Sequence, residues 1–269
     1  HVTGTTIVDL AAQLHKQGVG QGKVSAFVSA MGSAGTIAAG DRLKQVWSDH
    51  KIVGLEPIQC ATLYVNGYGS HEIQGIGDKH VTWIHNVLNM DALMCIDDSA
   101  CLDLLHTFAT APEHGLFTNA YGINPETVKN LSVSFGISGI CNILGAIKSA
   151  KYYNLGADDL IVTVATDSLA RYHSIVDVMQ AENPVSVDSA RYHIESFLQG
   201  ADTSWIMPGD ADAQQRWHNL KYYTWVEQQG KTVAELDAQR DPQWWVEQQA
   251  YIQQIDQQWL ERRQHQGLG

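Results

Sequence analysis

The sequence predicts an α/β fold with doubly wound, mostly parallel strands, followed by a helical C-terminal extension. Residues 24–30 and 51–55 read as short strands on either side of a helical stretch at residues 36–47. A second unit of this kind is expected between residues 131 and 165. A strand, a helix and a second strand in succession form a βαβ unit, which implies a parallel sheet covered by helices. Two such units favour a doubly wound α/β core.

The first unit begins with a helix that we expect from about Thr5 to Gln17. Its first strand, residues 24–30, alternates small and β-prone side chains and runs into the glycine-rich turn at residues 31–35. A helix should follow as far as about Trp47 before the next strand begins at Lys51.

The second unit is predicted to open with a serine-rich strand from Leu131, which ends before Gly136. A helix follows, and the strand at residues 160–165 completes the unit. Asn154 and Gly156 supply the stop signal of the helix. Its apolar face is predicted from residues spaced i, i+3, i+4 and i+7, namely Ile140, Ile143, Leu144 and Ile147.

The composition divides the chain into a core at residues 1–187 and a mainly helical extension at residues 188–269. The extension is rich in Gln, Trp and Tyr, and it contains the pentapeptide Trp-Val-Glu-Gln-Gln at residues 225–229 and 245–249. Two copies do not make a solenoid. We expect the aromatic side of the extension to pad the α/β core or a second subunit rather than to form a ligand box.

The overall composition favours a globular protein with a small-molecule partner. The net charge of −12 and the scattered basic residues argue against nucleic-acid binding. Apolar runs such as residues 160–165 are too short to cross a bilayer, and no leader opens the sequence, so a cytoplasmic location is expected. The four cysteines are expected to be buried free thiols, and no metal-binding motif is present. The start at His1, without Met and close to a helix, indicates a fragment.

The glycine-rich turn at residues 31–36 has the form of an anion-binding loop. A turn between a strand and a helix presents free N–H groups at the positive end of the helix dipole. The turn is not a Walker A loop, because no Lys-Ser/Thr pair follows Gly35, and Ala34 breaks the GxGxxG pattern. Taken alone, it is explained equally well as a tight connection with small residues for packing.

Five short motifs, taken in order, resemble the landmarks of the cysteine-synthase family. They lie at residues 1–4, 29–37, 53–57, 71–77 and 136–138, and the resemblance covers about residues 1–180. The family belongs to the fold-type-II enzymes that use pyridoxal 5'-phosphate (PLP), with the tryptophan-synthase-β-like fold, and it includes the cystathionine β-synthases. The extension is similar to the tails of a longer cysteine-synthase-like subgroup, through residues 219–223 and 225–229.

The resemblance implies roles for two of these motifs and for one strand end. The glycine-rich loop would hold the cofactor phosphate, and the later loop would line the substrate side of the ring. The strand end near residue 167 would face the pyridine nitrogen, where a carboxylate would stabilise the protonated ring. With the register off by one, Ser168 would instead make a neutral hydrogen bond. The implied residues are Gly32, Ser33, Ala34, Gly35 and Thr36 for the phosphate, Gln74, Gly75, Ile76 and Gly77 for the substrate side, and Asp167 or Ser168 for the ring nitrogen.

The implied function is PLP-dependent β-replacement or β-elimination on a serine- or cysteine-like amino acid, by a homodimeric transferase or lyase. The family's Schiff-base lysine and substrate-carboxylate loop would lie before His1, so the catalytic residues are unknown here. Lysines on amphipathic helices, among them Lys148 and Lys151, are expected to be solvated. A non-catalytic PLP or phosphate-ligand module, or a partner subunit, is the alternative. A nicotinamide-dependent dehydrogenase is disfavoured, because Pro57 follows Glu56 and the glycine spacing fails.

Overall fold

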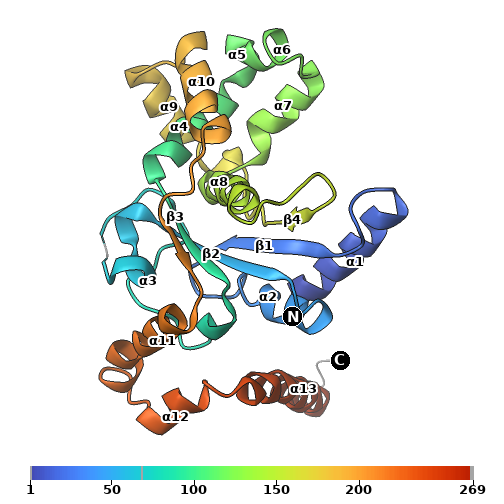
Figure 1. Ribbon diagram of the computed structural model, residues 1–269, viewed down its shortest axis with the longest axis vertical. Helices are drawn as coiled ribbons and strands as arrows, with labels where there is room; N and C mark the ends of the chain where they lie inside the picture. The colour runs from blue at the N-terminus through green and yellow to red at the C-terminus, as the bar shows by residue number, and fades with distance from the viewer. Residues whose placement is uncertain (1, 68, 267–269) are drawn as a thin grey trace.

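The computed structural model describes residues 2–67 and 69–266, and a five-stranded sheet in the order β4-β1-β2-β3-β5 lies at its centre (Figure 1). Strand β1 pairs in parallel with β2 and β4, and β2 pairs in parallel with β3. Strand β5 is antiparallel to β3. The strands are β1 (Val24–Ala30), β2 (Lys51–Pro57), β3 (Ala92–Ile96), β4 (Leu160–Val162) and β5 (Ile206–Pro208).

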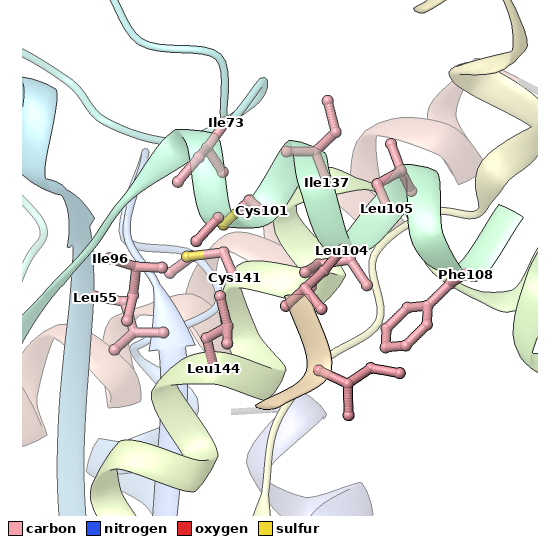
Figure 2. Close-up of a cluster of buried hydrophobic side chains, with 14 of the residues drawn as sticks. Leu55, Ile73, Ile96, Cys101, Leu104, Leu105, Phe108, Ile137, Cys141 and Leu144 are labelled. Atoms are coloured by element: carbon pink, nitrogen blue, oxygen red, sulfur yellow. The ribbon is translucent and has the colours of Figure 1, made fainter. Parts of the chain in front are cut away.

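Helices cover both faces of the sheet. Successive side chains of a strand point to opposite faces, and those of β1 and β2 are buried on both. One face, which includes Val28 and Leu55, packs against α4 (Asp98–Ala109) and α8 (Ile137–Tyr152). Figure 2 shows Leu55 and Ile96 from the strands against Cys141 and Leu144 of α8. The other face, which includes Phe27 and Ile52, packs against α1 (Val2–Lys16), α2 (Ala39–Val46) and α11 (Ala211–Asn219). The doubly wound, mostly parallel α/β class is therefore confirmed.

The remaining elements are short, except for the last helix. The α-helices are α3 (Thr62–Val65), α5 (Ala111–His114), α6 (Leu116–Asn119), α7 (Pro125–Ser134), α9 (His173–Glu182), α10 (Val187–His193), α12 (Val233–Ala238) and α13 (Pro242–His265). Three 3-10 turns lie at Ile58–Cys60, Val87–Asn89 and Leu169–Arg171, and π-helical turns lie at Ile194–Gln199 and Tyr222–Val226.

Most elements of the two βαβ units lie where the sequence predicts them. Strand β1 matches residue for residue, and α8 ends near Asn154, which adopts the left-handed conformation at φ 52°. The predicted serine-rich strand from Leu131 is wrong, because those residues belong to α7. The Asn124 side chain accepts a hydrogen bond from the Glu126 N–H at 2.8 Å, and Pro125 occupies the first turn. This cap and proline start a helix that continues through the serines.

The C-terminal extension packs on the α/β core, as expected for its aromatic side. Strand β5 extends the sheet, and Trp217 of α11 is fully buried against the face opposite α8. The Trp225 indole donates to the Val81 carbonyl at 2.8 Å. The buried Lys221 ammonium donates to three oxygens, those of Trp83, His85 and Gln239. The expected division of the chain into residues 1–187 and 188–269 stays a prediction. The ends of these two ranges, His1 and residues 267–269, lie outside the described residues.

Within the described part of the chain, no single helix is long and apolar enough to span a membrane. One pair, α7 and α8, passes by length and composition when the two helices are taken together, with a bend of 112° between them.

Candidate functional site

A cavity of about 520 Å³ lies where the order of the parallel strands reverses. From β1 the chain continues to β2 and β3 on one side, whereas β4 pairs with the other side of β1. At such a switch point the segments that follow the two strands diverge and leave a crevice at the carboxyl ends, where α/β proteins bind ligands. We call this space the glycine-loop cavity. Its lining comes from the end of β1 (residues 29–30), the loop after it (residues 32–37), residues 74–76, Ser138 and Asn142 of α8, and Thr166, Asp167, Arg171 and Tyr172 after β4.

The loop after β1 presents unpaired amides to this cavity. Among the residues that the structure describes, the backbone N–H groups of residues 32–37 donate to no acceptor. Ala34 is almost fully buried in the left-handed conformation at φ 68°, which is uncommon for a residue with a side chain. Successive amides around such a residue form a concave anion site, and α2 begins a few residues later with the positive end of its dipole toward the loop. The hydroxyls of Ser33 and Thr36 add two donors. Strained backbone of this kind is typical of ligand-binding sites.

The second predicted loop approaches the first closely. A Cβ atom on Gly32 would lie 3.2 Å from the Gly75 carbonyl oxygen, so the two loops touch backbone to backbone. The Gly77 N–H donates to the Met31 carbonyl at 2.9 Å, and a Cβ atom on Gly77 would overlap the His71 ring. The structure therefore places Gln74, Gly75 and Ile76 on the cavity wall, with Gly77 behind the wall as the residue that ties the loops together.

The Asp167 carboxylate also lines the cavity, and one of its two oxygens accepts no hydrogen bond. Its Oδ2 accepts a hydrogen bond from the Tyr172 hydroxyl at 2.6 Å, whereas its Oδ1 is buried without a hydrogen-bond partner in the described structure. Burial and this bond to Asp167 raise the pKa of Tyr172 above its ordinary value. Gly136 lies against Oδ1 and leaves no room for a Cβ atom. Ser168, the alternative in the predicted register, is not among the residues that line the cavity.

Helix α8 closes the crevice through side chains that sequence reasoning had not assigned to the site. The Asn142 amide accepts from the Ala30 N–H at 2.8 Å and donates to the Val164 carbonyl at 2.7 Å, so it joins the end of β1 to the segment after β4. One turn earlier, the Ser138 hydroxyl lies 2.7 Å from that of Thr166. The signal was present in the spacing, because residues 138 and 142 are four apart and share a helix face.

The site therefore combines two complementary ends. The amides of residues 32–37 suit a phosphate-sized anion, and charge-assisted hydrogen bonds to an anion are among the stronger polar contacts in proteins. The free Asp167 oxygen suits an N–H donor on the same ligand. A cavity of about 520 Å³ is in the usual range for small-molecule sites. Fold and site together define a doubly wound α/β protein with a small-molecule-sized cavity at its switch point, and the unpaired amides there suit an anion.

The comparisons with known proteins agree with this class. The chain matches no protein-family model. It is 30% identical to cysteine synthase B of Campylobacter jejuni over 149 residues. This aligned stretch covers 55% of this chain and 42% of that protein. It also resembles O-acetylserine sulfhydrylase isoform 3 from Entamoeba histolytica at 26% identity, with a TM-score of 0.51 over 71% of this chain and 50% of that one. A hydrogen sulfide-producing enzyme from Fusobacterium nucleatum is 25% identical, with a TM-score of 0.50 over 71% of this chain and 49% of that one.

The chain is therefore similar to the cysteine synthases, and its sheet has the α/β architecture of these neighbours. The chain spans about half the length of the relatives that it matches, or slightly less.

We predict that Asn142→Ala lowers the free energy of unfolding by about 2–4 kcal/mol, because it leaves the Ala30 N–H and the Val164 carbonyl unpaired. Urea denaturation measures the loss. Asn130→Ala on the exposed side of α7 is the matched control, and its effect should stay within about 0.5 kcal/mol. Hydrogen exchange at the Ala30 amide should accelerate in the Asn142 variant, and unchanged protection there would contradict the bridging role.

Proposed function

We propose that this chain is the cofactor-phosphate-binding part of a PLP-dependent enzyme that acts at the β-carbon of a serine- or cysteine-like amino acid. The single observation that carries the proposal is the pairing of the unpaired amides of residues 32–37 with the unpaired Asp167 oxygen around one cavity. The likeness to cysteine synthase B supports the reaction class, which is β-replacement or β-elimination.

The residues present fit PLP at both of its polar ends. The phosphate would accept hydrogen bonds from the amides of Gly32 to Ile37 and from the hydroxyls of Ser33 and Thr36. The pyridine nitrogen would carry a proton and donate a hydrogen bond to the Asp167 carboxylate. PLP bound in this way supplies an electron sink for a carbanion on the substrate.

The other lining residues position these groups. The Tyr172 hydroxyl fixes the orientation of the Asp167 carboxylate through its 2.6 Å hydrogen bond. Gly75, at φ 85° and with open space around its Cα, lets a flat ligand approach the backbone. The pair formed by Ser138 and Thr166 holds the segment after β4 against α8.

The proposal extends to the setting in which the protein works. The four cysteines are free and buried, which suits a reducing compartment such as the cytoplasm. We propose a small amino-acid substrate and a homodimer, as the resemblance to the cysteine synthases implies. A second candidate is a module that holds PLP or another phosphate ligand without covalent attachment. The unpaired amides support this candidate, because backbone N–H groups at the start of a helix can hold an anion without a lysine.

The phosphate role is tested by comparing Gly35→Asp with Gly35→Asn, two variants of equal size that differ in charge. A Cβ atom on Gly35 would lie 3.8 Å from the nearest atom, so the loop accepts either side chain. We expect the Asp variant to bind PLP at least about 30-fold more weakly than the Asn variant, because a carboxylate would face the phosphate. Fluorescence titration with PLP measures both affinities. Equal affinities would place the phosphate elsewhere.

The ring-nitrogen role is tested by Asp167→Asn, with Ser168→Ala as the control at the neighbouring position. Loss of the charge-assisted hydrogen bond should weaken PLP binding by about 10- to 100-fold. The ¹⁵N chemical shift of labelled PLP should also show the pyridine nitrogen changing from protonated to neutral near pH 7. Ser168→Ala should leave both measurements unchanged. A silent Asp167 variant together with a damaging Ser168 variant would show that the register is off by one residue.

The two candidate functions are distinguished with the 269-residue chain and PLP alone. Arg171 is the basic side chain in the described lining of the cavity, and no lysine lines it. We therefore expect reversible PLP binding, no lysine labelled stoichiometrically after borohydride reduction, and no sulfide or pyruvate released from cysteine. Mass spectrometry and the two product assays provide the measurements. A single labelled lysine accompanied by turnover would contradict this expectation and establish the enzyme within this chain.

A further inference from the structure

A second cavity, of about 350 Å³, lies at the carboxyl end of β3, between α8 and residues 196–205 of the extension. We call it the extension cavity. It shares no lining residue with the glycine-loop cavity. Much of its wall is apolar, from Ile58, Ile96, Leu144, Phe197 and Trp205.

The ammonium group that lines this cavity lacks strong partners. Lys148 of α8 is only 9% exposed, contrary to the expectation that it is solvated. Its one polar contact in the described structure is a 3.5 Å ion pair with Asp202, whose side chain is 69% exposed. By contrast, Lys151, less than one turn away, donates to the carbonyls of Gln199 and Ala201 at 2.9 and 2.6 Å. A buried charge with so little compensation is costly unless a further anion meets it.

Two carboxylates line the same cavity. Asp202 is held by the Ser204 N–H and hydroxyl, at 2.9 and 2.6 Å, and these bonds lower its pKa. Asp97 caps α4 through its Oδ1, which accepts from the Ser99 N–H at 2.8 Å. A simple anion in the cavity would meet these carboxylates, and a simple cation would meet Lys148. A zwitterion satisfies both charges.

Strained backbone fixes the indole at the wall of the cavity. Trp205 adopts the left-handed conformation at φ 55°, which is rare for a bulky residue. Its carbonyl accepts from the Cys95 N–H at 3.0 Å, and its ring lies 5.2 Å from that of Tyr64. Such strain persists where the surrounding contacts hold it, and it clusters at ligand sites.

We propose that the extension cavity binds a free α-amino acid with an apolar side chain. Its carboxylate would pair with Lys148, its ammonium with Asp97 and Asp202, and its side chain with the apolar wall. The volume suits a ligand of this size. Helix α8 joins this site to the glycine-loop cavity, because Ser138 and Asn142 line one cavity and Leu144 and Lys148 line the other. The proposal stands independently of PLP binding.

The test uses calorimetric titration of the 269-residue chain with L-methionine. Two analogues that each lack one charge are compared with it, 4-(methylthio)butanoate without the ammonium and 3-(methylthio)propylamine without the carboxylate. L-methionine should saturate the protein, and each analogue should bind at least about tenfold more weakly. The absence of saturable L-methionine binding up to about 10 mM would overturn the proposal, as would equal binding of all three compounds.

Variants locate the site. Lys148→Met should lower the affinity for L-methionine at least about tenfold, whereas Lys129→Met on the exposed side of α7 should not change it. The ligand-free melting temperature of Lys148→Met should be unchanged or higher, because an apolar side chain replaces a poorly compensated buried charge. Ala201→Leu fills the cavity without altering charge and should also weaken binding. Gly35→Asp should leave it unchanged, which separates this site from the proposed PLP site. Wild-type affinity in both the Lys148 and the Ala201 variants would overturn the assignment.

Discussion

The Asn142 side chain makes the interaction on which the candidate site depends. Its amide bonds to the backbone at the end of β1 and in the segment after β4, at 2.8 and 2.7 Å. The segments after these two parallel strands diverge, because the sheet order reverses at β1. Strand pairing sets the separation of β1 and β4, and the Asn142 bridge carries it beyond the paired residues to the amide loop after β1 and the segment that holds Asp167. A ligand that contacts both needs that separation to be set before it binds.

The C-terminal extension completes the sheet and the second cavity. Strand β5 adds an antiparallel edge to β3, and residues 196–205 form one wall of the extension cavity. The buried Lys221 ammonium further ties the extension to the segment after α3 through the carbonyls of Trp83 and His85. Lys221 has three oxygen acceptors, whereas Lys148 has one long ion pair. This difference separates a lysine that stabilises the fold from one whose charge remains available to a ligand.

The elements predicted well are those with strong local signals. Strand β1 and the end of α8 at Asn154 follow from alternation, helical spacing and a residue that tolerates positive φ. Helix α7 was mistaken for a strand at its serine-rich end, because the Asn124 cap and Pro125 that start it lie further back in the chain. Strand β3 was not predicted, since a short, fully buried apolar run has no periodicity to identify it.

The sequence by itself determined the glycine-rich loop, the order of the five motifs and the identity of Asp167, because each depends on residue type and short spacing. Only the tertiary structure decided that Asp167 rather than Ser168 lines the cavity and that one carboxylate oxygen stays unpaired. It also decided that Lys148 is buried, through packing against a segment about fifty residues away. Burial and hydrogen-bond satisfaction depend on which distant segments meet, and helical periodicity alone places Lys148 on a helix without showing what covers it.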